Sequence, residues 1–226
     1  MANEKKKLKH IPKSRVQILD VSTELGRAGI VATQVLCGAA VVAGLKTVPA
    51  LWNLHLITQP VQTLQIALVF CLFVSSSFSC PCSRNSSARR LVMSAGTVVA
   101  ALVALAFGAP TSFEFAARTW HWACLMSSLT VLPAAIVLGA SWTDWQRVFA
   151  FTKPHGGVEL AICIPAHGAA LGAWVGAWPM PLDWERPWQE WPVCCTYGAG
   201  GGYLLGLVVT VVLCFVNVRN VRPKQD

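Results

Sequence analysis

YGAGGGYLLGLVVTVVLCFV, residues 197–216, contains twenty residues and not one charged side chain. The hydrocarbon core of a bilayer is about 30 Å thick, so an α-helix of about 20 apolar residues crosses it. The stretch therefore predicts a transmembrane helix, and the rest of the fold has to be compatible with a membrane.

Five further apolar blocks precede this stretch. The six predicted spans are residues 28–45, 61–78, 91–107, 120–140, 155–178 and 197–216. Only 12% of the 226 residues are charged, whereas a soluble domain usually carries about a quarter. We therefore expect an all-α polytopic membrane protein, a bundle of six transmembrane helices. The longest connection between spans, residues 179–196, is too short for a separate catalytic domain.

Lysine and arginine are distributed unevenly between the two sides of this topology. With the N-terminus in the cytoplasm, 15 of the 18 basic residues face the cytoplasm, in segments 1–27, 79–90, 141–154 and 217–226. The positive-inside rule therefore predicts cytoplasmic N- and C-termini, a basic segment 1–27 and a basic tail 217–226. The polar start has no small-residue cleavage pattern, so we do not expect a cleaved signal peptide. Nucleic-acid binding is not expected, because no basic face is formed.

Small residues recur at every fourth position in three of the blocks. The glycines concerned are Gly96, Gly108, Gly168, Gly172, Gly176, Gly198, Gly202 and Gly206. A helix face of this kind lets a second backbone approach closely, which favours helix association in lipid. Packing within the bundle is the favoured interpretation, and contact of at least one ridge with a partner chain stays open.

The connection PMPLDWERPWQEWP, residues 179–192, is the most unusual stretch of the chain. Its four prolines restrict the backbone. Its three tryptophans and Arg186 are of the residue types that dominate binding hot spots. Eight of the ten tryptophans lie on the same, non-cytoplasmic side: 52, 120, 122, 174, 178, 184, 188 and 191. The stretch therefore predicts a rigid aromatic platform for a lipid headgroup, a sugar or a partner protein.

Catalytic and metal-binding chemistry is not predicted. Arg186 lies among the acids of the 179–192 connection, and Arg186 and Glu190 have salt-bridge spacing if the segment is helical. Cys80 and Cys82 have no nearby histidine, so zinc binding is not expected. No serine, cysteine or threonine comes with a base and an orienting acid, and no cofactor is expected.

Ionisable residues within the predicted spans are few. Glu159 lies near the cytoplasmic end of the fifth span, where it can reach the interface. His167 follows Pro165 by two residues, and a proline within a helix frees a backbone carbonyl. We expect a neutral His167 that bonds to such a carbonyl.

Residues 172–195, GAWVGAWPMPLDWERPWQEWPVCC, resemble the signature of the phosphatidylinositol-glycan class F family. The resemblance runs from Gly108 to the end of the chain. Further matching pieces are Gly108-Ala-Pro110, residues 111–116, residues 129–133, Leu138-Gly139, Gly198-Ala199 and Gly202-Tyr203. The pair Cys194-Cys195 departs from the family pattern, and a disulfide or simple burial are both open.

The resemblance implies a multi-pass membrane protein of the endoplasmic reticulum that acts in glycosylphosphatidylinositol (GPI) anchor biosynthesis. Members of the family are non-catalytic subunits that stabilise the large ethanolamine-phosphate transferases, which modify the mannoses of the GPI glycolipid. The implied partners are these catalytic subunits and membrane lipids. An alternative is a lipid-handling subunit that presents phosphatidylethanolamine or the GPI glycolipid to the transferase.

On this interpretation the contact is made by Trp184, Arg186, Trp188 and Trp191, with Asp183 and Glu185 holding Arg186 in place. Gly172 and Gly176 would allow a helix to approach closely. The full set predicted to bind a partner or lipid is Gly172, Trp174, Gly176, Asp183, Trp184, Glu185, Arg186, Pro187, Trp188, Gln189, Trp191 and Pro192.

Overall fold

The computed structural model describes residues 29, 31–47, 50, 56–77, 86–139, 141–154, 156–182 and 184–221. All regular elements within these residues are helices, so the all-α prediction is confirmed. Several predicted features lie outside the described residues: the basic segment 1–27, the tail after Val221, Trp52, Cys80, Cys82 and Asp183.

Three helices are long and apolar enough to cross a membrane. They are α6 (Phe113–Leu138), α8 (Gly157–Ala177) and the Val193–Val216 part of α9 (Val193–Val221). Three shorter apolar helices accompany them: Val31–Lys46, Pro60–Phe73 within α4 (Pro60–Ser77), and Arg90–Ala106 within α5 (Ser86–Ala106). The described residues thus contain three full-length candidate spans, and six spans remain a prediction.

The remaining elements are short. The π-helical turn η1 (Ala43–Thr47) ends the first helix. The helix α7 (Trp142–Trp145) and the π-helical turn η2 (Gln146–Ala150) connect α6 to α8. The 3-10 turn η3 (Pro187–Gln189) lies between α8 and α9.

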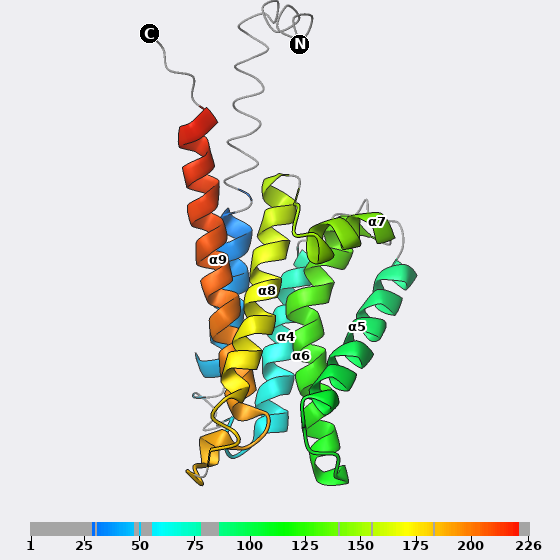
Figure 1. Ribbon diagram of the computed structural model, residues 1–226, viewed down its shortest axis with the longest axis vertical. Coiled ribbons are helices and arrows are strands. Elements are labelled where there is room, and N and C mark those ends of the chain that lie inside the picture. The colour runs from blue at the N-terminus through cyan, green and yellow to red at the C-terminus, as the bar shows by residue number, and fades with distance from the viewer. Residues whose placement is uncertain are drawn as a thin grey trace, which may run out of the picture.

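The helix α6 lies at the centre of the bundle and contacts α4, α5 and α8. The helices α8 and α9 form by far the most extensive pair, and Figure 1 shows them side by side. In the same view α5 leans against α6 at the edge farthest from α9 (Figure 1). The connection 179–192 lies at one end of the bundle, called here the loop end, and α7 lies at the opposite end (Figure 1).

The core consists of aliphatic and small side chains between the central helices. Leu64 and Ala67 of α4 and Leu125 and Leu129 of α6 belong to one buried cluster, together with Leu207 of α9. The outer helix faces expose many large apolar side chains, such as Leu102 and Leu205. A water-soluble surface rarely exposes so much apolar area, whereas the faces of membrane helices do.

Gly108 ends α5 and lies outside the packing ridge in which the sequence placed it. Its φ is +95°, and a Cβ atom there would meet nothing within 4 Å. Its N–H bonds to the carbonyl of Leu105 and that of Ala109 to the carbonyl of Ala104, which is the Schellman arrangement of a helix C-terminus. Gly108 is therefore a helix-terminating residue, because only glycine adopts this φ without strain.

Candidate partner-binding surface

The connection 179–192 is held together by the side chain of Gln189. Its Nε2 donates to the carbonyl oxygens of Pro179 (2.6 Å) and Leu182 (2.9 Å), and its Oε1 accepts from the N–H of Arg186 (2.9 Å). Gln189 is only 8% exposed. The sequence placed this residue at the contact, whereas the structure uses it inside the loop to fix three backbone positions.

Trp191 anchors the end of this connection to α6. Its Nε1 donates to Thr119 Oγ1 (2.9 Å), and its ring packs on Trp122 with 5.0 Å between ring centroids. Trp191 is 6% exposed, and the following Pro192 is fully buried. These two residues therefore belong to the core and present almost no free surface, although the sequence predicted them to bind a partner or lipid.

Among the predicted contact residues of this connection, those that face outward are consecutive. Trp184 is 57% exposed and Trp188 is 37% exposed, with ring centroids 6.0 Å apart in an edge-on arrangement. Glu185, Arg186 and Pro187 between them are also exposed. We call residues 184–188 the aromatic platform. Trp174, on α8, is exposed as well but lies outside it.

Neither Glu185 nor Glu190 forms the predicted ion pair with Arg186, and the third predicted partner, Asp183, lies outside the described residues. Glu190 bonds to Arg118 Nη1 at 2.5 Å, and the Arg118 guanidinium lies 4.7 Å from the centre of the Phe115 ring. Arg186 and Glu190 would share a helix face only if the segment were helical, and η3 is a single turn. Among the described acidic residues, none forms an ion pair with Arg186.

The glycine ridges of α8 and α9 pack on each other. A Cβ atom at Gly172 would lie 2.1 Å from the carbonyl oxygen of Gly198, and one at Gly202 would lie 2.1 Å from that of Gly168. Gly176 and Gly206 lie in the same contact. Gly96 of α5 packs against the side chains of Ser127 and Val131 of α6. These contacts are within the chain.

An open groove of about 900 Å³ runs beside this contact. It is lined by Pro179 and Trp188 near the loop end and by Thr152 and Pro154 near the opposite end. The Cys194 thiol lies on the same lining and donates to the carbonyl of Trp188 (2.7 Å). The groove therefore begins beside the aromatic platform and follows the α8–α9 pair.

The proline of α8 frees a carbonyl whose partner the sequence did not reveal. Pro165 has no N–H for the carbonyl of Ala161, and Gln34 Nε2 donates to that oxygen instead (3.0 Å). His167 bonds through Nδ1 to the carbonyl of Cys163 (2.8 Å) and stacks on the Phe149 ring. The sequence feature that could have indicated this bond is Gln34 itself, a lone amide side chain within the apolar block 28–45.

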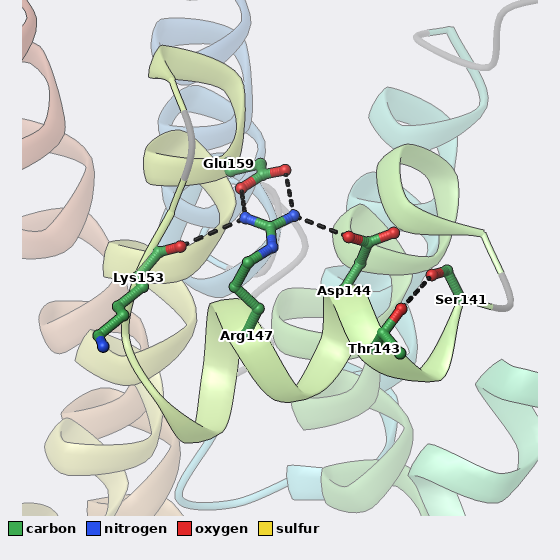
Figure 2. A network of polar contacts seen from close by, with 6 residues as sticks. All are labelled: Ser141, Thr143, Asp144, Arg147, Lys153 and Glu159. Atoms are coloured by element: carbon green, nitrogen blue, oxygen red, sulfur yellow. Dashed lines mark hydrogen bonds and ion pairs between the residues drawn. The ribbon is translucent and has the colours of Figure 1, made fainter. Parts of the chain in front are cut away.

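Arg147, in the turn η2 that follows α7, is the centre of a polar cluster (Figure 2). Its guanidinium donates to both carboxylate oxygens of Glu159 (2.5 and 2.8 Å), to Asp144 Oδ1 (2.8 Å) and to the carbonyl of Lys153 (3.3 Å). The hydrogen bonds to Glu159, and then the one to Asp144, raise the pKa of Arg147. The cluster fastens η2 to the start of α8, so Glu159 has a structural role.

Metal-ligand groups do not converge in the described part of the chain, where no three His, Cys, Asp or Glu residues are placed to hold an ion. Cys194 and Cys195 are both buried free thiols. Of the two alternatives for this pair, the structure shows burial.

The family model of the GPI biosynthesis protein family Pig-F matches residues 39–211. The human protein "GPI ethanolamine phosphate transferase, stabilizing subunit" is 38% identical over 120 residues, which are 53% of this chain and 54% of the relative. Its mouse counterpart is 36% identical over 125 residues, 55% of this chain and 57% of the relative.

Fungal relatives match as well. The "Glycosylphosphatidylinositol anchor biosynthesis protein 11" of Neurospora crassa is 40% identical over 107 residues, 46% of this chain and 36% of the relative. The chain spans about half the length of the human and mouse relatives. No solved structure matches. Because the family model covers well over half of the residues, the chain belongs to the GPI biosynthesis protein family Pig-F.

Proposed function

We propose that this chain is the non-catalytic stabilising subunit of a GPI ethanolamine-phosphate transferase in the endoplasmic reticulum membrane. The observation that carries the proposal is membership of the Pig-F family, with human and mouse relatives that bear the name of a stabilising subunit. The catalytic chain would supply the chemistry of ethanolamine-phosphate transfer to the GPI mannoses, and this chain would hold it in a folded, abundant form.

The topology that goes with this function has six crossings, within residues 28–216, and both termini in the cytoplasm. The start of the helix Val31–Lys46 and the end of α9 lie toward the same end of the bundle in Figure 1, which supports an even number of crossings. The 15 basic residues that the predicted topology assigns to the side of the N-terminus support a cytoplasmic assignment for segments 1–27 and 217–226. The aromatic platform would then face the lumen.

The aromatic platform is suited to hold a partner because it is already ordered. Gln189 fixes the loop backbone and Trp191 anchors it to α6, so little conformational freedom is lost when a partner binds. Trp184, Arg186 and Trp188 are exposed, and these residue types contribute most to binding energy at interfaces. We assign the contact to these three residues.

The test is recovery of the catalytic subunit with tagged variants of this chain, expressed in cells that lack it. Trp188→Ala and Arg186→Ala should reduce the co-purified catalytic subunit, identified by mass spectrometry, and the surface display of GPI-anchored proteins. Trp142→Ala removes a tryptophan at the opposite end that is more exposed than Trp188 (72% against 37%) and is the control. Unchanged recovery with both platform variants would rule out this contact.

A second candidate function is lipid handling, in which the platform presents phosphatidylethanolamine or the GPI glycolipid. It is favoured by Arg186, which is exposed beside two tryptophans and has no ion-pair partner among the described acids. A guanidinium of this kind suits a lipid phosphate. Lipid that co-purifies with the wild-type chain and is lost from Arg186→Ala, with the catalytic subunit still bound, would favour this function.

A further inference from the structure

The groove beside the α8–α9 contact has exposed apolar walls. Leu171 and Val175 of α8 form one wall, and Leu205 and Val209 of α9 form the other. All four side chains are exposed. The six glycines of the two ridges lie between these walls and line the groove. The floor of the groove is therefore largely backbone.

The length of the groove favours a transmembrane helix as its occupant. Its lining extends from Thr152 and Pro154, before α8, to Pro179, after α8. The 21 residues of α8 between them rise about 30 Å at 1.5 Å per residue, which is the full thickness of a hydrocarbon core. The acyl chains of one lipid fill a single leaflet, about half of that length, whereas a transmembrane helix fills all of it.

The floor also suits a helix. Although the glycines of α8 and α9 already pack on one another, Gly168, Gly172 and Gly202 keep part of their surface open toward the groove. A helix that enters can approach two backbones at once, which gives the dense packing that replaces the hydrophobic effect between helices in lipid. The walls then enclose its sides.

The imidazole of His167 in the groove requires a hydrogen-bond donor from the occupant. The carbonyl of Cys163 can only accept a hydrogen bond, so Nδ1 of His167 is the donor, and in the neutral imidazole Nε2 is then an acceptor. Among the described residues Nε2 has no hydrogen-bond partner, and His167 lines the groove near the middle of α8. An acceptor left unpaired in hydrocarbon is unfavourable, and a hydroxyl or amide of an entering helix would satisfy it.

We propose that this groove is the binding site for one transmembrane helix of the catalytic subunit. The helix carries small and aliphatic residues along the glycine floor and a Ser, Thr, Asn or Gln opposite His167. This inference rests on the proposed function and names the intramembrane part of the contact, which is separate from the aromatic platform.

The test places a photo-crosslinking amino acid at Leu171 and, separately, at Leu205 in the full-length chain, with irradiation in intact membranes. A position on α5, Leu102, is equally exposed and lies outside the groove, so it serves as the control. Both groove positions should give a crosslink to a transmembrane peptide of the catalytic subunit, and Leu102 should give none. Mass spectrometry of the crosslinked peptide identifies the helix and shows whether a donor residue lies at mid-membrane.

A second measurement uses variants that fill or alter the groove. Val175→Trp and Leu205→Trp should lower recovery of the catalytic subunit at least about fivefold, whereas Leu102→Trp should not. His167→Phe keeps the ring and removes the acceptor, so recovery should fall about three- to tenfold, as expected for one interhelical hydrogen bond. Thermal unfolding of each purified variant shows whether the subunit itself remains folded.

The outcomes separate this inference from the function on which it rests. If the groove positions crosslink only to lipid while the catalytic subunit still co-purifies, the groove assignment is overturned and the stabilising function stands. If the unmodified chain does not co-purify with the catalytic subunit, both proposals fail. A crosslink from Leu102 equal to those from the groove would also overturn the assignment.

Discussion

The side-chain amide of Gln34 donates a hydrogen bond of 3.0 Å to the carbonyl oxygen of Ala161, which joins the helix Val31–Lys46 to α8. Within α8 this carbonyl would normally accept from residue 165, which is a proline. Gln34 is 6% exposed, so the bond forms out of contact with solvent. The proline and the amide thus act as one unit, although they lie on different helices.

Gln34→Leu should lower the free energy of unfolding by about 1 kcal/mol, because it leaves the Ala161 carbonyl unpaired in an apolar environment. Pro165→Ala restores a helical N–H for that carbonyl, so Gln34→Leu should cost less than half as much in the Pro165→Ala background. The measurement is thermal unfolding of the four proteins in detergent. An equal cost in both backgrounds would show that the two sites are independent.

Gly202→Ala and Gly201→Ala form a matched pair on adjacent residues of α9. A Cβ atom at Gly202 would lie 2.1 Å from the carbonyl oxygen of Gly168, whereas one at Gly201 would meet nothing within 4 Å. Gly202→Ala should therefore force α8 and α9 apart and lower stability by at least about 2 kcal/mol. Gly201→Ala should raise it by roughly 0.5–1 kcal/mol through helix propensity.

Unfolding temperatures of the two glycine variants, measured in the same detergent, test this difference in stability. Protein yield from membranes is a second readout, because a separated helix pair is degraded. Comparable losses for both substitutions would contradict the close contact between the ridges.

Trp191→Phe and Trp122→Phe remove an indole from the same stacked pair. Trp191 Nε1 donates to Thr119 Oγ1, whereas Trp122 Nε1 is buried without a partner among the described residues. The two substitutions lose similar ring area, but only Trp191→Phe breaks a hydrogen bond, so it should cost about 1 kcal/mol more. When Thr119→Val is also present, most of the difference between the two tryptophan variants should disappear. Chemical denaturation monitored by tryptophan fluorescence measures the free energy of unfolding of each variant.

Local sequence pattern predicted some of these features and could not predict others. The spacing of the α8 and α9 glycines indicates close helix approach, but the same spacing recurs in α5 and contains no information on which ridge meets which. The sequence Gly108-Ala-Pro110 extends that spacing in α5, although the proline that follows marks a helix end. The helix that contains the predicted span 120–140 begins about two turns before Trp120, at Phe113, and Glu114 and Arg118 lie in these additional turns.

The connection 179–192 also has features that the sequence predicts and features that it does not. Composition predicted a rigid, tryptophan-rich loop, but not which tryptophan points inward. That depends on Thr119 for Trp191, a residue far away in the sequence. The inward direction of Gln189 likewise depends on carbonyls that only the folded loop brings together. Hydrogen bonds between distant segments produce no periodic pattern in the sequence, so only the three-dimensional structure shows them.

Gln189→Leu should open the connection 179–192 without unfolding the bundle. The substitution removes the donors to Pro179 and Leu182 and the acceptor for Arg186, while it keeps a side chain of similar volume. Limited proteolysis in this segment should become at least several-fold faster, because the loop is no longer fixed. Glu185→Gln, at an exposed position in the same loop, is the control. Equal cleavage rates for the two variants would show that Gln189 does not hold the loop.

Glu159→Gln and Asp144→Asn test the cluster in Figure 2, where two carboxylates share Arg147. Glu159 accepts two hydrogen bonds from Arg147, and its side chain is less exposed than that of Asp144, so solvent screens this ion pair less. Glu159→Gln should lower the unfolding temperature by about 2–4 °C, and Asp144→Asn by clearly less. High salt should reduce the effect of Asp144→Asn more than that of Glu159→Gln. Thermal unfolding at low and high salt measures both, and a larger loss from Asp144→Asn would mean that the Glu159 pair does not fasten η2 to α8.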